Sequence, residues 1–328
     1  MKTVEEYLDS LPSDTIKITL SRKNLTRLPD LSRFYKLEQL ICCNNRLSKI
    51  PELHKTLKML SCDYNELTSL PELHDNLELL NCSSNNLTIL PDLPDKLKTL
   101  ICYNNNLTSL PDLPDKLRIL ICNNNVLTSL PDLPNSLIDL YCSNNRLTSL
   151  PKLNDNLKDL YCSYNCLKSL PKLNDKLEVI SCCNNELTNL PTISKNVTRI
   201  ICYSNKLTSL PQLTDKIQIL HYVYNPIYDI ININDNDIHD DINNIIMNNH
   251  IRNNNDKDIL NKKLHILYKF KHLYYSLKFK KQFRDLLWVK VREPKIREKY
   301  SPENLKRLIS NMQDHEDGEE FDRLLQEW

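Results

Sequence analysis

Residues 97–113 read Leu-Lys-Thr-Leu-Ile-Cys-Tyr-Asn-Asn-Asn-Leu-Thr-Ser-Leu-Pro-Asp-Leu, and residues 117–133 repeat the same frame twenty positions later. The shared pattern is L-x-x-L-x-C-x-x-N-x-L-T-x-L-P-x-L. Its asparagine recurs every twenty residues without a slip, at Asn45, Asn65, Asn85, Asn105, Asn125, Asn145, Asn165, Asn185, Asn205 and Asn225. A fixed period of this length is the sequence signature of a solenoid, in which each repeat forms one coil.

The segment before and around each cysteine favours a short strand. In residues 97–102, Leu100 and Cys102 are two positions apart, and the period of two predicts that both point inward. A single coil cannot bury its own apolar face, so successive coils stack and their strands run in parallel. About ten stacked coils would give one continuous core and a curved sheet on the concave side, with neighbouring strands about 4.8 Å apart.

This frame resembles the leucine-rich repeat, in particular the short 20-residue type found in secreted bacterial effectors and in repeat proteins of giant DNA viruses. The resemblance covers residues 15–226. It implies an α/β solenoid, a leucine-rich repeat superhelix with a curved parallel β-sheet on the concave face and an extended convex side. The convex prolines, such as Pro91 and Pro94, favour extended backbone because they remove helical hydrogen-bond donors.

The recurring asparagine has a mechanical interpretation. Its amide can satisfy backbone groups where the chain leaves the strand, and stacked coils allow these amides to form a ladder. We interpret this column as structural rather than catalytic. The predicted ladder consists of Asn45, Asn65, Asn85, Asn105, Asn125, Asn145, Asn165, Asn185 and Asn205.

Nine of the twelve cysteines occupy the inward strand position of the repeat. They are Cys42, Cys62, Cys82, Cys102, Cys122, Cys142, Cys162, Cys182 and Cys202. A buried free thiol packs as a small hydrophobic residue, so this file predicts a spine of reduced thiols. One file with a period of twenty residues gives no tetrahedral ligand cluster, and we expect no metal site and no cofactor. Cys43, Cys166 and Cys183 lie outside the file and are expected on or beside the concave surface.

The outward strand positions vary between coils and are the candidate recognition surface. A contiguous apolar and aromatic band is predicted there, flanked by two acids. It comprises Leu79, Ile101, Tyr103, Ile119, Ile121, Tyr141 and Tyr161, with Asp139 and Asp159 beside them. Exposed side chains of this kind are typical of a protein-binding hot spot, although β-branched and aromatic residues also simply suit strands.

A third outward column is expected at the position after each spine cysteine. It holds Asp63, Tyr103, Asn123, Ser143, Ser163 and Tyr203. No Ser-His-Asp set, paired catalytic carboxylates or histidine cluster recurs across the three columns. The predicted surface is therefore not that of an enzyme.

The composition excludes several function classes. The 328-residue chain has a single glycine, Gly318, and no alanine, so the glycine-rich loops that cradle phosphates or dinucleotides cannot be built. Lys and Arg number 43 against 42 Asp and Glu, which gives no overall attraction to nucleic acid. The acidic start at Met1–Glu6 is unlike a signal peptide, and no apolar run is long enough to span a bilayer. These features predict an intracellular protein, in host cytoplasm or in a virion, that is not secreted.

The ends differ from the repeats. Thr3-Val4-Glu5-Glu6 forms a capping-box pattern, which predicts a capping helix over residues 3–10 within an N-terminal segment of residues 1–14. An Asn-rich linker is predicted at 227–256 and a helical tail at 257–328, basic before residue 308 and acidic after it. The tail is similar to those of other giant-virus repeat proteins.

Three functions follow as hypotheses. The first is a non-enzymatic protein–protein interaction module that binds a partner through the concave leucine-rich repeat face. The second is a ubiquitin-ligase adaptor that recruits through the tail, although Cys202 is the last cysteine and the tail therefore lacks the nucleophile of the bacterial effector ligases. The third is a binder of nucleic acid or a lipid surface through the basic helix, against which stands a fold-back of the acidic end. The identity of the partner and the oligomeric state are left open.

Overall fold

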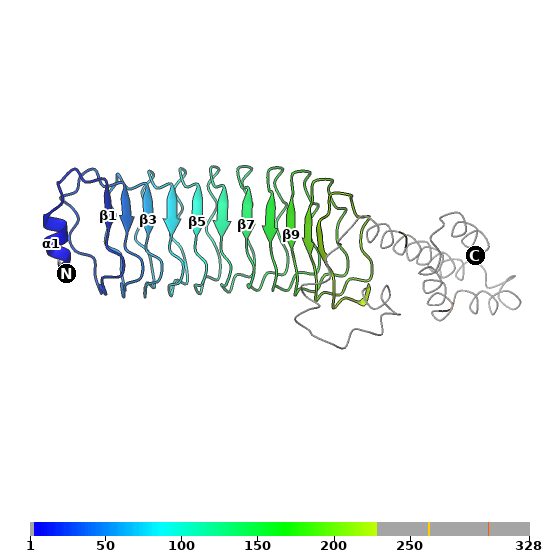
Figure 1. Cartoon of the computed structure of the whole chain (residues 1–328). Coiled ribbons are helices and arrows are strands. Elements are labelled where there is room, and N and C mark those ends of the chain that lie inside the picture. Colours follow the sequence, from blue (N-terminus) through cyan, green and yellow to red (C-terminus); the bar gives the residue numbers. More distant parts are fainter. Residues whose placement is uncertain (1–2, 228–261, 263–300, 302–328) are drawn as a thin grey trace, which may run out of the picture.

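The computed structural model describes residues 3–227 and the isolated positions 262 and 301. This part of the chain is a parallel β-solenoid, with one helix followed by eleven short strands (Figure 1). All the strands lie in one sheet in sequence order, so each inner strand is hydrogen-bonded to the strands of the coils before and after it. The predicted linker and tail, from residue 228 onward, otherwise lie outside the described residues.

The helix α1 (Val4–Asp9) covers the N-terminal end of the stack (Figure 1). The Glu6 backbone N–H donates to the Thr3 hydroxyl at 3.1 Å, and the Thr3 N–H donates to the Glu6 carboxylate at 2.9 Å. This reciprocal pair is the capping box expected from the sequence. Leu8 is buried against the first coil, so the helix shields apolar surface that an open stack would expose.

Each strand has three residues. The strands are β1 (Lys17–Thr19), β2 (Gln39–Ile41), β3 (Met59–Ser61), β4 (Leu79–Asn81), β5 (Thr99–Ile101), β6 (Ile119–Ile121), β7 (Asp139–Tyr141), β8 (Asp159–Tyr161), β9 (Val179–Ser181), β10 (Arg199–Ile201) and β11 (Ile219–His221). Paired residues are twenty apart in sequence, as in Leu100↔Leu120, except that β1 and β2 are offset by twenty-two. The register therefore places equivalent residues of neighbouring coils side by side.

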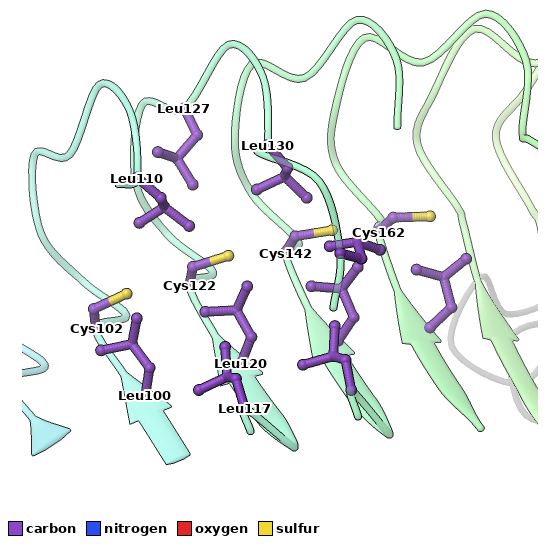
Figure 2. Packing of buried hydrophobic residues seen from close by; sticks show 14 of the residues in the cluster. Leu100, Cys102, Leu110, Leu117, Leu120, Cys122, Leu127, Leu130, Cys142 and Cys162 are labelled. Atoms are coloured by element: carbon purple, nitrogen blue, oxygen red, sulfur yellow. The ribbon is translucent and has the colours of Figure 1, made fainter. Parts of the chain in front are cut away.

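The core is one continuous apolar cluster that runs through all the coils. The middle residue of every strand is buried, and Leu100 and Leu120 are fully inaccessible. Figure 2 shows these leucines beside Cys102 and Cys122, with Leu110 and Leu130 of the following connections in the same buried cluster. Each coil thus buries its inward face against its neighbours, as the repeat pattern predicts.

The cysteine file is fully buried, and all twelve cysteines are free thiols. In Figure 2 the side chains of Cys102, Cys122, Cys142 and Cys162 share one orientation, so they follow one another along the stack without facing each other. Burial raises the pKa of the Cys82 and Cys122 thiols to about 12, and it raises the pKa of the Cys102 thiol as well. These thiols stay protonated at neutral pH and act as packing groups.

We expect native-state alkylation to separate the cysteines into two classes. Iodoacetamide should modify the exposed Cys166 in the folded protein, while the nine buried spine cysteines react only through unfolding, because the thiolate is the nucleophile. Peptide mass spectrometry over a time course measures this difference, and protein in denaturant, where all twelve sites should react, is the control. Spine cysteines that react as fast as Cys166 would refute the packed-thiol assignment.

The turn after each strand uses a left-handed residue that is not glycine. From Asn44 onward one residue per coil has φ between 51° and 55°, including Asn104 and Asn124, and the first coil has two, Arg22 and Asn24. Asparagine therefore often supplies a conformation that most residues avoid. Interstrand hydrogen bonding continues through this turn, since the Asn104 N–H donates to the Asn123 carbonyl at 3.1 Å. Within the described residues, no helix is both long and apolar enough to cross a membrane.

Candidate partner-binding surface

The asparagine column holds neighbouring coils in register. The side-chain oxygen of Asn125 accepts from the Leu107 N–H of the preceding coil at 3.0 Å. Its amide nitrogen donates to the Cys102 carbonyl of that coil at 3.0 Å and to the Cys122 carbonyl of its own coil at 3.1 Å. The ladder is therefore built from hydrogen bonds between asparagine side chains and backbone groups, and the ladder side chains do not hydrogen-bond to one another. The same contacts recur in the coils of Asn85, Asn105, Asn145, Asn165, Asn185 and Asn205.

The register brings the predicted band together on one face. We call the outward positions of β1 to β11 the open sheet face. Eight of the nine predicted partner-binding residues lie at outward positions of β4 to β8, and Tyr103 follows β5 by two residues. Each of the nine is half-buried. The sequence predicted exposed side chains, and their exposure is smaller than predicted. Neighbouring strands are so close that adjacent side chains cover one another. The residues are Leu79, Ile101, Tyr103, Ile119, Ile121, Asp139, Tyr141, Asp159 and Tyr161.

Two tyrosines form a stacked pair in the middle of this face. The register aligns Tyr141 with Tyr161, and their ring centroids are 4.7 Å apart with an interplanar angle of 6°. The centroid distance matches the normal spacing of neighbouring strands, about 4.8 Å, so the sheet itself sets the stack. The rings are stacked without a partner, and they supply aromatic area of the kind found in binding hot spots.

Two aspartates lie beside the stack. Asp139 and Asp159 are directly paired across β7 and β8, two residues before the tyrosines on the same face. Burial raises the pKa of both carboxyl groups, and the charge of Asp139 raises the pKa of Asp159 further. The charge of Lys158 lowers both pKa values in part, and its ammonium forms an ion pair with Glu178 at 3.0 Å, whose own charge raises the pKa of Asp159.

Replacing both aspartates by asparagine should stabilise the protein at neutral pH. Between the ordinary carboxyl pKa of 3.8 and the raised values, the folded protein holds more protons than the unfolded chain, so stability falls as pH rises through this window. Like charges directly opposite on a sheet are destabilising, and we expect Asp139→Asn/Asp159→Asn to gain about 0.5 kcal/mol at about pH 7 and nothing at about pH 3. Urea unfolding at the two pH values measures the difference. An equal gain at both would assign the effect to something other than charge.

The third column is only partly open, which corrects the sequence interpretation. Ser163 is 5% exposed and Cys183 is 4% exposed, although both were expected on or beside the surface. The strand ends one residue before the spine cysteine, so the alternation of inward and outward side chains no longer holds at the next position. The Ser163 hydroxyl instead hydrogen-bonds the Ser181 hydroxyl at 2.9 Å and accepts from the Cys183 N–H at 3.2 Å.

Sequence reasoning missed two exposed tyrosines beside the band. Tyr64 and Tyr164 occupy the left-handed turn position, and half of each side chain is exposed. Burial, followed by contacts with Cys183 and Tyr164, raises the pKa of the Tyr203 phenol, so Tyr164 helps to cover this edge of the face. A signal was present in the sequence, because both tyrosines precede a ladder asparagine at the same position of the repeat.

The described residues contain no group of three or more His, Cys, Asp or Glu side chains arranged to hold a metal ion. What the open sheet face offers is a fixed aromatic pair, two neighbouring carboxylates and flanking aliphatic side chains. Such an arrangement suits recognition of another molecule's surface.

Solved leucine-rich repeat proteins resemble this structure. YopM from Yersinia enterocolitica matches with 35% sequence identity and a TM-score of 0.64, over 66% of this chain and 48% of the YopM chain. The leucine-rich repeat domain of APL1B is 20% identical, with a TM-score of 0.53, over 63% of this chain and 68% of that domain. A Shigella effector leucine-rich repeat domain is 32% identical, with a TM-score of 0.45, over 50% of this chain and 74% of that one.

These likenesses, together with the stacked coils, show that the described part of the chain has the leucine-rich repeat fold. The chain spans about half the length of the YopM chain that it matches. No protein-family model matches the sequence, and no curated protein matches it.

Proposed function

We propose that this protein is a non-enzymatic protein–protein interaction module that binds its partner on the open sheet face, centred on Tyr141 and Tyr161. The stacked pair is the observation that carries the proposal. Aromatic side chains dominate hot spots because they bury large areas and lose little conformational entropy on binding. The strand register already places the two rings in contact in the free protein, which favours a small loss of entropy on binding.

The surrounding residues support the same reading. Ile119 and Ile121 precede the tyrosine pair on β6, and both are half-buried, so a partner that covers the rings also removes apolar surface from water. The leucine-rich repeat fold of YopM and of this chain supports an interaction role for such a face.

We also propose that the protein acts inside a cell, in host cytoplasm or in a virion. The twelve free cysteines support a reducing compartment, because disulfides form and persist in oxidising ones. We propose that it is a giant-virus protein, on the resemblance of its repeat and tail sequence patterns.

An affinity pull-down from a host-cell lysate tests the binding face. The wild-type protein is compared with Tyr141→Ala/Tyr161→Ala, and we expect a partner enriched by the wild type to be reduced at least tenfold by the variant, the scale of a lost hot spot. Since both rings lie on the outward face, the variant should keep its fold, which circular dichroism verifies.

The matched control is Tyr35→Ala/Tyr224→Ala, which removes two exposed rings near the two ends of the solenoid and leaves the stacked pair intact. It should retain the partner. Enrichment that survives the loss of Tyr141 and Tyr161 would contradict the proposal and would move the search to the C-terminal region.

A further inference from the structure

The paired carboxylates of Asp139 and Asp159 carry an inference about what the partner presents. In the outward positions of β2 to β9 they are the only charged side chains. The other outward residues of these strands are aliphatic, aromatic or neutral polar. Positive charge appears among the outward positions only at Lys17 of β1 and Arg199 of β10, apart from any charge on His221 of β11.

Neither carboxylate forms an ion pair within the fold. No side-chain hydrogen bond or ion pair joins Asp139 or Asp159 to another residue of the described part of the chain, and the Lys158 ammonium forms its ion pair with Glu178. The charges of Arg118 and Arg199 act on the pair without forming an ion pair with it. Two like charges held side by side in a half-buried position, with no cation in direct contact with either, favour a ligand that supplies one.

The tyrosine stack extends this preference from charge to shape. Tyr141 and Tyr161 follow the aspartates by two residues on the same two strands, a separation of about 7 Å along the sheet. A basic side chain that reaches the carboxylates therefore passes its aliphatic stem, or the plane of a guanidinium, against the aromatic pair. A bare metal ion would leave this aromatic surface uncovered, so the geometry favours an organic cation on a longer chain.

We propose that the open sheet face recognises a basic side chain, arginine or lysine, on an extended segment of the partner protein, with its charge between Asp139 and Asp159 and its stem against Tyr141 and Tyr161. This inference rests on the proposed function and specifies the partner's chemistry at the same surface. The two neighbouring carboxylates lower the stability of the free protein, and a bound cation would restore that stability.

A phage-displayed library of random peptides tests the inference without knowledge of the partner. The full chain is panned against the library, and a selected peptide is synthesised with a fluorescent label and titrated by anisotropy. We expect selected sequences to be enriched in arginine or lysine beside an apolar residue. Their affinity should fall about tenfold or more with Asp139→Asn/Asp159→Asn, the scale of a lost charged hydrogen bond.

The matched control is Asp95→Asn/Asp115→Asn, which removes two exposed aspartates with the same spacing from the connections between strands. It should leave the affinity unchanged. Basic peptides that bind the Asp139→Asn/Asp159→Asn variant as well as they bind the wild type would overturn the inference.

A third variant separates the two proposals. Selected peptides that lose affinity with Tyr141→Ala/Tyr161→Ala but contain no enriched basic residue would overturn the inference and leave the proposed binding face standing. If no selected peptide depends on either pair, both proposals fail. Basic peptides that depend on both pairs support both.

Discussion

Replacing Asn125 by alanine will lower the free energy of unfolding by about 4 kcal/mol, because one buried backbone donor loses its only partner and three further hydrogen bonds disappear. Asn125 is 8% exposed, and its oxygen is the acceptor for the Leu107 N–H. The Cys102 and Cys122 carbonyls each keep a second partner in a neighbouring ladder amide, so they are weakened rather than orphaned. Urea unfolding followed by circular dichroism measures the loss.

Two variants serve as comparisons for Asn125→Ala. Asn123→Ala removes a side-chain amide outside the ladder and should lower the free energy of unfolding by less than about 0.5 kcal/mol, as surface substitutions usually do. Asn125→Asp keeps the acceptor for Leu107 but turns a carboxylate oxygen toward two carbonyls, so it should be at least as damaging at neutral pH and partly recover in acid. If Asn125→Ala matched Asn123→Ala, the ladder would contribute little to stability.

Leu120→Ala will cost about 3 kcal/mol, within the range measured for large-to-small changes in packed cores. Leu120 is the fully buried centre of β6, and the register places it between Leu100 and Leu140 of the neighbouring strands. The regular coil spacing prevents the neighbouring leucines from collapsing into the cavity without disturbing several strands at once. Calorimetry or urea unfolding gives the size of the change.

The adjacent Ile121→Ala is the matched control, because it removes a similar aliphatic side chain from the half-buried outward face of the same strand. It should lower the free energy of unfolding by about 1 kcal/mol. Equal costs at positions 120 and 121 would contradict the inward and outward assignment on which the candidate surface depends.

The repeat made most of the fold predictable from the sequence. A strict twenty-residue period fixes which residues share a column, and the alternation within each strand separates Leu120 from Ile121. The capping box at Thr3 and Glu6 is a local pattern whose hydrogen bonds need no distant contact. Even the tyrosine stack follows from identical residues in one column of neighbouring strands.

The remaining features depend on geometry that the period does not contain. The sequence does not show that the strands stop after three residues, and this is why Ser163 and Cys183 are buried instead of open. Nor does it show that Lys158 forms its ion pair with Glu178 rather than with Asp139 or Asp159. Side-chain partners across coils are decided by distances of a few ångströms, whereas the repeat specifies only which coil lies next to which.

Site-specific photo-crosslinking tests the central claim most directly, namely that a partner binds the open sheet face. A benzophenone side chain is placed at position 121, beside the tyrosine pair, and in a second protein at position 116, in the connection before the same strand. We expect a partner crosslink from position 121 that disappears with Tyr141→Ala/Tyr161→Ala, and no crosslink from position 116. A crosslink from position 116 alone, or one from position 121 that survives the loss of both tyrosines, would contradict it.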